Sequence, residues 1–210
     1  LYLSAEQKLT YKLSVSYGPR YSNFQRLGKE EINIYENNEA VVFNPEFQIY
    51  EEGTPIGTKY YGTNKSIVSF GNLEPRLAMA YALNDDKSIK FSHNRMSQYT
   101  HLISNTASAT PLDIWAPSDK FLKPEISDQV ALGYLQNFGG DNYSLEVETF
   151  YKTIKNKADY IDGANLIAHK AIERVLLNGK ARSYGLELMA RKNTGRLTGW
   201  LSYTLSKAEQ

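Results

Sequence analysis

The chain contains 210 residues, and its 24 lysines and arginines nearly balance 23 aspartates and glutamates, which leaves a net charge of +1. This balance removes the basic surface that nucleic-acid binding needs, and an apolar content of 41% removes the signature of a disordered chain. The absence of cysteine excludes disulfides, cysteine-ligated zinc and thiol nucleophiles. No apolar run approaches the roughly 20 residues of a membrane-spanning helix.

The first predicted elements come from strict alternation of apolar and polar residues, which is the period of a β-strand with two different faces. The clearest stretch reads Leu13, Val15 and Tyr17 on one face, with Ser14 and Ser16 on the other. In chain order, seven such stretches span 9–18, 76–83, 88–92, 129–134, 143–151, 183–188 and 197–205. The sequence therefore predicts an all-β protein.

The connections between these stretches alternate in length. Short links rich in turn-forming residues occur at 84–87, 139–142 and 192–195, and a fourth is expected at 4–7, after a strand end at 1–3. Long links cover 22–68, 99–124 and 154–180. Loops of this length in a compact domain are usually functional. In an antiparallel meander, this alternation places all short turns at one end and all long loops at the other.

The third long link allows two interpretations. Residues 165–177 contain apolar residues at roughly the spacing of one helix face, and this pattern ends before Asn178-Gly179. The same Asn-Gly pair also suits a hairpin turn between 171–177 and 180–186. We favour the hairpin, because strands that extend beyond the main sheet suit a protein of the kind described below.

Tyrosine is twice as frequent as phenylalanine, with 16 residues against 8. Tyrosine favours strands in soluble proteins, but it also collects where dry and wet surroundings meet. A strand of about 10 residues, rising about 3.3 Å per residue at a tilt near 45°, spans about 23 Å, close to the apolar band of an outer-membrane barrel. Two aromatic girdles are then expected: Tyr17, Tyr151, Tyr184 and Tyr203 toward the long loops, and Tyr81, Tyr134 and Tyr143 toward the short turns.

The opposite face of these strands is polar, with Lys12, Arg76, Lys90, Gln129, Glu146, Glu148 and Glu187. A girdled apolar face with a polar reverse face predicts a transmembrane antiparallel β-barrel in contact with outer-membrane lipid. A barrel must close, and single-chain bacterial barrels have even strand numbers from eight upward. Seven strands and a fragment therefore predict a piece of a larger barrel. Leu1 to Ser4 carry no signal peptide, so we expect that a leader was removed or that the natural chain starts earlier.

Several short motifs occur in an informative order. They are Asn72-Leu73-Glu74-Pro75-Arg76, Lys123-Pro124-Glu125 with Gln129, Gly133 and Tyr134, then Gly179-Lys180-Ala181-Arg182, Tyr184-Gly185-Leu186-Glu187-Leu188 and Gly199-Trp200-Leu201-Ser202-Tyr203. With this order, nearly the whole chain resembles the C-terminal half of the barrel in TonB-dependent outer-membrane receptors, particularly the Bacteroidetes-type transporters. Each motif is weak alone.

The resemblance implies a plugged, 22-stranded barrel, of which residues 1–210 would be a part. It also implies import of a scarce nutrient such as a siderophore, glycan or peptide, powered by the TonB complex and in some cases assisted by a surface lipoprotein. The plug domain, the energy-coupling box and the closing strand with its terminal aromatic residue are not recognisable in this sequence.

No catalytic set stands out, and we expect neither an enzyme nor a cofactor. The histidines His93, His101 and His169 form no His-Glu-x-x-His pair. A metal shared by His93 and His101 is conceivable, although ordinary exposed histidines are the simpler interpretation. Glu146 and Glu148 point the same way, as paired carboxylates of a hydrolase would, but the polar lining of a barrel explains them better.

The long loops are the candidate ligand surface. Tyr60 and Tyr61 lie in the first, and Tyr99, His101 and Trp115 in the second. Their rings suit a sugar, a peptide or a metal chelate, and Pro111 and Pro117 would hold the Trp115 loop. Packing among loops is the competing explanation for each residue. The sequence also allows two other interpretations: a soluble, surface-exposed β-sandwich that binds carbohydrate, and a non-transporting outer-membrane barrel or adhesin.

Overall fold

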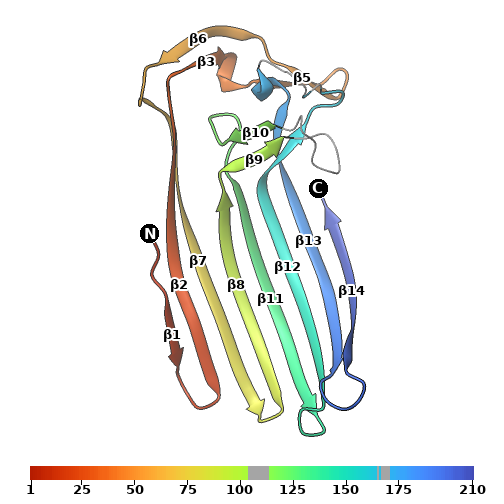
Figure 1. Cartoon of the computed structure of the whole chain (residues 1–210). Helices are drawn as coiled ribbons and strands as arrows, with labels where there is room; N and C mark the ends of the chain where they lie inside the picture. The colour runs from red at the N-terminus through yellow and green to blue at the C-terminus, as the bar shows by residue number, and fades with distance from the viewer. Residues whose placement is uncertain (104–113, 165, 167–170) are drawn as a thin grey trace.

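The structure is a computed structural model that describes residues 1–103, 114–164, 166 and 171–210. Most of the chain forms one antiparallel eight-stranded sheet in the order β1-β2-β7-β8-β11-β12-β13-β14. In Figure 1 the short turns lie together at the bottom, and the long connections gather in a cap at the top. The prediction of an all-β, antiparallel fold is confirmed.

The strands of the main sheet differ in length. They are β1 (Ala5–Lys8), β2 (Leu13–Leu27), β7 (Ser66–Asn84), β8 (Lys87–Gln98), β11 (Glu125–Phe138), β12 (Tyr143–Tyr160), β13 (Leu176–Lys192) and β14 (Gly199–Glu209). Turns occur at 85–86 and 139–142, as their composition predicts. The turn expected at 192–195 spans 193–198 instead, so the strand expected at 197–205 begins only at Gly199. Gly139, Gly140 and Gly195 adopt positive φ angles there, a conformation that glycine reaches without steric cost.

The N-terminal turn was predicted wrongly. Residues of the expected turn at 4–7 belong to β1, where Glu6 pairs with Ser16 and Gln7 with Val15. The chain turns later, at 9–12, because the Thr10 hydroxyl accepts hydrogen bonds from the backbone N–H groups of Lys12 and Leu13 at 3.2 and 3.0 Å. The strand expected at 9–18 therefore begins at Leu13.

The preferred hairpin at Asn178-Gly179 is also wrong. Both residues lie inside β13, paired with Ala158 and Lys157 of β12. A register shift between Lys155 and Lys157 absorbs Asn156, whose φ is +57°, and the ladder then continues to Tyr160. Residues 172–174 form a single 3-10 turn, η2 (Ile172–Arg174), whereas 165 and 167–170 of the alternative helix lie outside the described residues.

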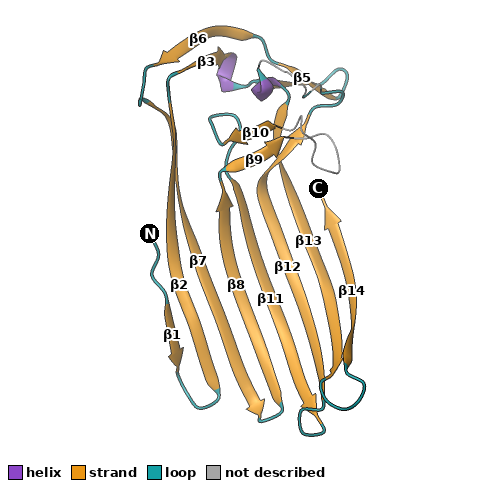
Figure 2. Ribbon diagram, viewed as in Figure 1, coloured by secondary structure: helices purple, strands orange, loops and turns teal. Residues whose placement is uncertain are grey.

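The cap contains three small hairpins and two short 3-10 turns (Figure 2). Strand β3 (Glu30–Tyr35) pairs with β6 (Pro55–Tyr61), β4 (Val41–Asn44) with β5 (Ile49–Glu52), and β9 (Thr100–Ile103) with β10 (Ile114–Pro117). The turn η1 (Glu36–Asn38) follows β3. The first two long links therefore have secondary structure of their own.

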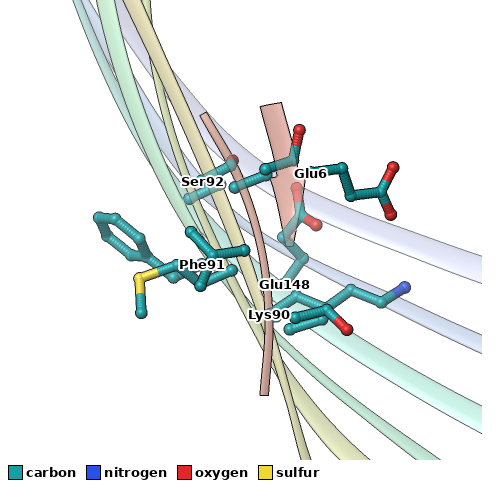
Figure 3. A pocket seen from close by; sticks show the side chains of 13 residues that line it. Glu6, Lys90, Phe91, Ser92 and Glu148 are labelled. Carbon is teal, nitrogen blue, oxygen red and sulfur yellow. The ribbon is translucent and has the colours of Figure 1, made fainter. Parts of the chain in front are cut away.

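The two faces of the main sheet differ as the alternation predicts. Figure 3 shows the sheet curving, with Lys90, Glu148 and Glu6 on its concave side and Phe91 on its convex side. The convex face is apolar and uncovered, with Leu132 51% and Leu205 61% exposed. Among the described residues, the one buried hydrophobic cluster lies at the cap end, around Ile103, Leu122, Leu166, Val175 and Leu176.

This placement of the core contradicts the β-sandwich alternative, because a sandwich buries its apolar strand faces against a second sheet. An apolar sheet face without a protein layer is instead the surface that a membrane barrel presents to lipid. No helix within the described residues is long and apolar enough to cross a membrane.

Candidate functional site: the girdles, the concave wall and the cap

The strand register orders the convex-face tyrosines into rows. Tyr17, Tyr151 and Tyr184 occupy one row, in which Leu77, His93 and Val130 fill the intervening strands. The rings of Tyr151 and Tyr184 stack with their centroids 6.3 Å apart. This row lies on the side of the apolar band that faces the cap.

A second row lies nearer the short turns and contains Tyr81, Tyr134 and Tyr203, with Ile89, Val147 and Leu188 between them and Leu13 beside Tyr81. Tyr143 follows the 139–142 turn directly. The register therefore groups Tyr203 with the tyrosines near the short turns, whereas the sequence pattern placed it near the long loops. The difference arises because β14 begins only at Gly199, so Tyr203 is its fifth residue.

The concave face is a polar wall. A pocket of about 280 Å³ opens on it, lined by Lys90, Ser92 and Glu148 among others (Figure 3). Lys90 Nζ of β8 lies 4.0 Å from Glu146 Oε1 of β12, so Glu146 faces a cation that reaches it across the intervening strand β11. This arrangement agrees with Glu146 and Glu148 as lining residues of a hydrated barrel interior.

Toward the cap, the wall holds a buried carboxylate. Glu74 is 2% exposed, and its Oε1 accepts a hydrogen bond of 2.7 Å from the Ser22 hydroxyl. Tyr99 joins the same network, because its hydroxyl lies 2.7 Å from Ser22 Oγ and accepts a bond of 2.8 Å from Asn72 Nδ2. The Tyr99 ring stacks on Phe24 with centroids 5.2 Å apart. Tyr99, a sequence-predicted ligand residue, thus joins β2, β7 and the chain after β8.

The cap segments are locked to one another through Tyr35. Its hydroxyl donates to Glu173 Oε1 at 2.8 Å, and Asn33 Nδ2 donates to the same oxygen at 2.9 Å. The Tyr35 ring meets Phe121 edge to face, with centroids 5.3 Å apart. Burial and the neighbouring Glu173 carboxylate raise the pKa of Tyr35, so its hydroxyl remains a hydrogen-bond donor across the physiological range. One side chain therefore joins all three long links.

Two arginines strengthen this lock. Arg26 contacts Asp119 and Glu30, each at 2.7 Å, and Arg174 donates from Nε to the Gly53 carbonyl at 2.8 Å while its Nη2 lies 3.1 Å from Glu52. A cleft of about 200 Å³ runs between these links and is lined by Arg26, Glu30, Asp119 and Glu173. Arg26 pairs with Glu30 and Asp119, and Glu173 accepts hydrogen bonds from Tyr35 and Asn33, so these side chains hold the cap segments together.

The two described histidines lie in different surroundings. His93 occupies the convex face of β8, with its Nε2 3.8 Å from Asp128 Oδ1. His101 is 2% exposed inside the cap, with its Nε2 3.0 Å from Ser118 Oγ. Burial lowers the pKa of His101, which favours the neutral ring. Within the described ranges no cluster of three or more His, Asp or Glu side chains could hold a metal; His169 lies outside them.

The remaining predicted ligand residues are displayed to solvent. Tyr60 is 61% exposed on β6 and Trp115 66% exposed on β10. Tyr61 is half-buried, with Lys59 Nζ 5.0 Å from its ring centroid. Pro117 ends β10, whereas Pro111 lies outside the described residues.

Sequence reasoning missed a further exposed aromatic group on the β4–β5 hairpin. Phe43, Phe47 and Tyr50 are all at least 45% exposed, and the Phe43 and Tyr50 rings pack 5.2 Å apart. The Asn44-Pro45 step marks this turn, and Asn44 Oδ1 accepts the backbone N–H of Glu46 at 3.0 Å. An Asn-Pro pair between aromatic residues was the available signal.

Comparison with known proteins agrees with this geometry. A family model described as TonB dependent receptor-like, beta-barrel, matches residues 1–210. No curated protein matches the chain. Two solved structures of the FrpB iron transporter from Neisseria meningitidis, the F5-1 apoprotein and the F3-3 variant, match with TM-scores of 0.58 at 19% and 20% identity. Each match covers 99% of this chain and 25% of the other.

The alcaligin outer-membrane receptor FauA from Bordetella pertussis matches with a TM-score of 0.56 at 15% identity, over 99% of this chain and 29% of its own. At this identity the solved structures show the fold alone, and the chain spans about a quarter of their length. The family match covers every residue. With its lipid-facing wall, polar concave face and cap, the chain belongs to the TonB-dependent receptor-like β-barrels of the outer membrane.

Proposed function

We propose that this chain forms wall and cap of a receptor that captures a ferric chelate outside the cell and passes it inward. The cap carries the proposal, because its three long links form one body that displays Tyr60 and Trp115. The structures that match are named as an iron transporter and as an alcaligin receptor, and the first of these names supports an iron-containing ligand. Members of this family are receptors rather than enzymes, as the sequence predicted.

In this proposal the five predicted residues divide into two groups. Tyr60 and Trp115 contact the ligand directly, with Tyr61 beside them, because flat exposed rings stack on the organic shell of a chelate. Tyr99 and His101 position the cap, since both are held inside by hydrogen bonds. Residues 1–210 are then part of a 22-stranded barrel, and import depends on a plug and on the TonB complex through other parts of the protein.

A second candidate ligand is a glycan or peptide, handled with a surface lipoprotein. The sequence motifs that resemble Bacteroidetes-type transporters support it, as do the exposed rings of the β4–β5 hairpin, which suit stacking on sugars. A non-transporting adhesin would use the same cap without energy coupling.

Binding can be tested by tryptophan fluorescence, because Trp115 lies exposed on β10 of the cap. In the full-length receptor, we expect a ferric chelate to quench a fluorescence component that is missing in Trp115→Phe, and we expect a loss of affinity of about tenfold in Tyr60→Ala, the scale of one stacked aromatic group. Tyr50→Ala is the matched control on the other hairpin. Binding of a glycan panel without any chelate would favour the second candidate, and uptake that persists without TonB would contradict import by this mechanism.

A further inference from the structure

The β4–β5 hairpin displays large apolar side chains on both of its faces. The strand register places Phe43 opposite Tyr50 on one face, and it places Val42 and Ile49 together on the other. Phe47 lies in the connecting turn. These five side chains are between 40% and 64% exposed. Such a concentration of exposed apolar groups marks a surface where another molecule binds.

Membrane lipid does not cover this hairpin. Figure 1 places β5 in the cap, at the end of the molecule opposite the short turns. The chain leaves the wall at the end of β2 and reaches the hairpin only after β3 and η1. The hairpin therefore lies beyond the tyrosine row on the cap side of the apolar band, and the molecule that covers it comes from the aqueous side.

The hairpin is held in place at its base. The backbone N–H of Gly53 donates to the Ala40 carbonyl at 2.8 Å, and Arg174 Nε donates to the Gly53 carbonyl at 2.8 Å. The Phe43 and Tyr50 rings pack with their centroids 5.2 Å apart. A ligand therefore meets an arm that is already ordered, so binding loses little of the entropy that a mobile loop would lose.

The charge of this part of the cap has one sign. Residues 30–58 contain seven glutamates and no lysine, arginine, histidine or aspartate. Two of the seven form ion pairs, Glu30 with Arg26 and Glu52 with Arg174. In the part of the chain that the structure describes, no cation lies within ion-pair distance of the other five, which are Glu31, Glu36, Glu39, Glu46 and Glu51. The hairpin therefore attracts cations.

A basic polypeptide fits both the apolar surface and the charge. Arginine and lysine side chains stack on exposed aromatic faces such as Tyr50, and carboxylates such as those of Glu46 and Glu51 attract them. Apolar side chains between the basic residues would cover Phe47 and Ile49. A neutral sugar would gain nothing from the net negative charge, an anionic ligand would be repelled by it, and a small cation would leave most of the apolar surface in water.

We propose that the β4–β5 hairpin docks a basic segment of another protein outside the cell. Cationic side chains of this segment stack on the ring pair of Phe43 and Tyr50. The same side chains form ion pairs with Glu46 and Glu51, and the apolar residues of the segment cover the rest of the hairpin. The rings proposed for the nutrient lie on β6 and β10, so this docking does not depend on which nutrient the cap captures.

The test uses the full-length receptor in an uncharged detergent. The probe is a fluorescein-labelled peptide of alternating arginine and valine, about eight residues long, which extends to about 26 Å. Its companion has glutamine in place of arginine, and fluorescence anisotropy measures the affinity of each. We expect the wild type to bind the arginine peptide, and we expect Phe43→Ala/Tyr50→Ala to weaken binding about tenfold, the scale of two cation–π contacts.

The contribution of charge is tested separately. We expect Glu46→Gln/Glu51→Gln to weaken binding about fivefold at low salt and to have no effect at about 0.5 M salt, where exposed charges are screened. The matched controls are Tyr60→Ala/Tyr61→Ala on β6 and Asp85→Asn/Asp86→Asn in a short turn at the opposite end of the molecule.

Equal affinity for the two peptides would overturn the proposal, as would the absence of binding to the wild type. Equal loss in the hairpin variants and their controls would also overturn it, because it would indicate a general effect of aromatic or charged surface. Binding of a neutral oligosaccharide that depends on Phe43 and Tyr50, without binding of the arginine peptide, would assign the hairpin to a sugar instead.

Chelate binding, read from Trp115 in the same variants, separates this result from the function of the cap. Unchanged quenching together with lost peptide binding supports the hairpin site alone, whereas parallel loss of both would contradict the separation of the two sites. Heat-dependent migration of the barrel confirms that each variant is folded.

Discussion

The hydroxyl of Tyr35 provides a sharp test of how the cap is held. Tyr35→Phe removes the 2.8 Å bond to Glu173 but retains the ring that meets Phe121. A hydrogen bond to a charged group contributes about 1.5–3 kcal/mol. Because Asn33 still donates to the same carboxylate oxygen at 2.9 Å, we expect the lower value, about 1.5 kcal/mol.

Hydrogen exchange of the full-length receptor measures this loss where it occurs. An opening free energy lowered by about 1.5 kcal/mol speeds exchange about tenfold, and the amides to follow are those of Arg174 and Val175, which bond to Ala171 and Ile172. Tyr50→Phe is the control, since Tyr50 is 48% exposed on the other hairpin. Unchanged exchange at Arg174 and Val175 in Tyr35→Phe, or equal acceleration in both variants, would refute the role assigned to Tyr35.

Three further outcomes are expected in the full-length receptor. Burial lowers the pKa of His101 in the folded cap, so acidification below its unfolded pKa of about 6.5 should lower the free energy of unfolding by at most about 1.4 kcal/mol per pH unit. Hydrogen exchange in β9 should therefore become faster in acid, and this acceleration should be absent in His101→Gln. Ser22→Ala leaves the buried Glu74 short of a donor and should lower stability by about 1–2 kcal/mol in thermal unfolding, whereas the exposed Ser16→Ala should not. In Gly185→Ala a Cβ would lie 2.7 Å from the Leu205 carbonyl, so the melting temperature should fall, while Gly199→Ala, with no atom within 4 Å, should leave it unchanged.

The strands that cross the lipid band were predictable because their two faces meet different media. Leu132 faces outward and Gly133 inward in the same strand, and each position obeys its own rule of polarity. Tight turns such as 139–142 were also predictable, because the positive φ angles that they require restrict the residue types that can occur there. Both signals are local, so the sequence alone sufficed.

Outside the lipid band, the polarity of a residue no longer predicts which face of the strand it occupies. In the cap end of β13 both faces contact protein or water, so Asn178-Gly179 reads as a turn although it is paired within a ladder. The contact between Tyr35 and Glu173 joins positions 138 residues apart, and no short pattern announces it.

Each wall strand has one apolar face and one polar face, and this arrangement also affects how the protein reaches the outer membrane. The mean hydropathy of the chain is only −0.49, because polar or small residues alternate with the large apolar ones in the wall strands. A secretion channel releases sideways into the inner membrane only those segments that are hydrophobic along their whole length. The wall strands never present such a segment, so the residues that face the barrel interior also let the nascent polypeptide cross the inner membrane without being trapped there.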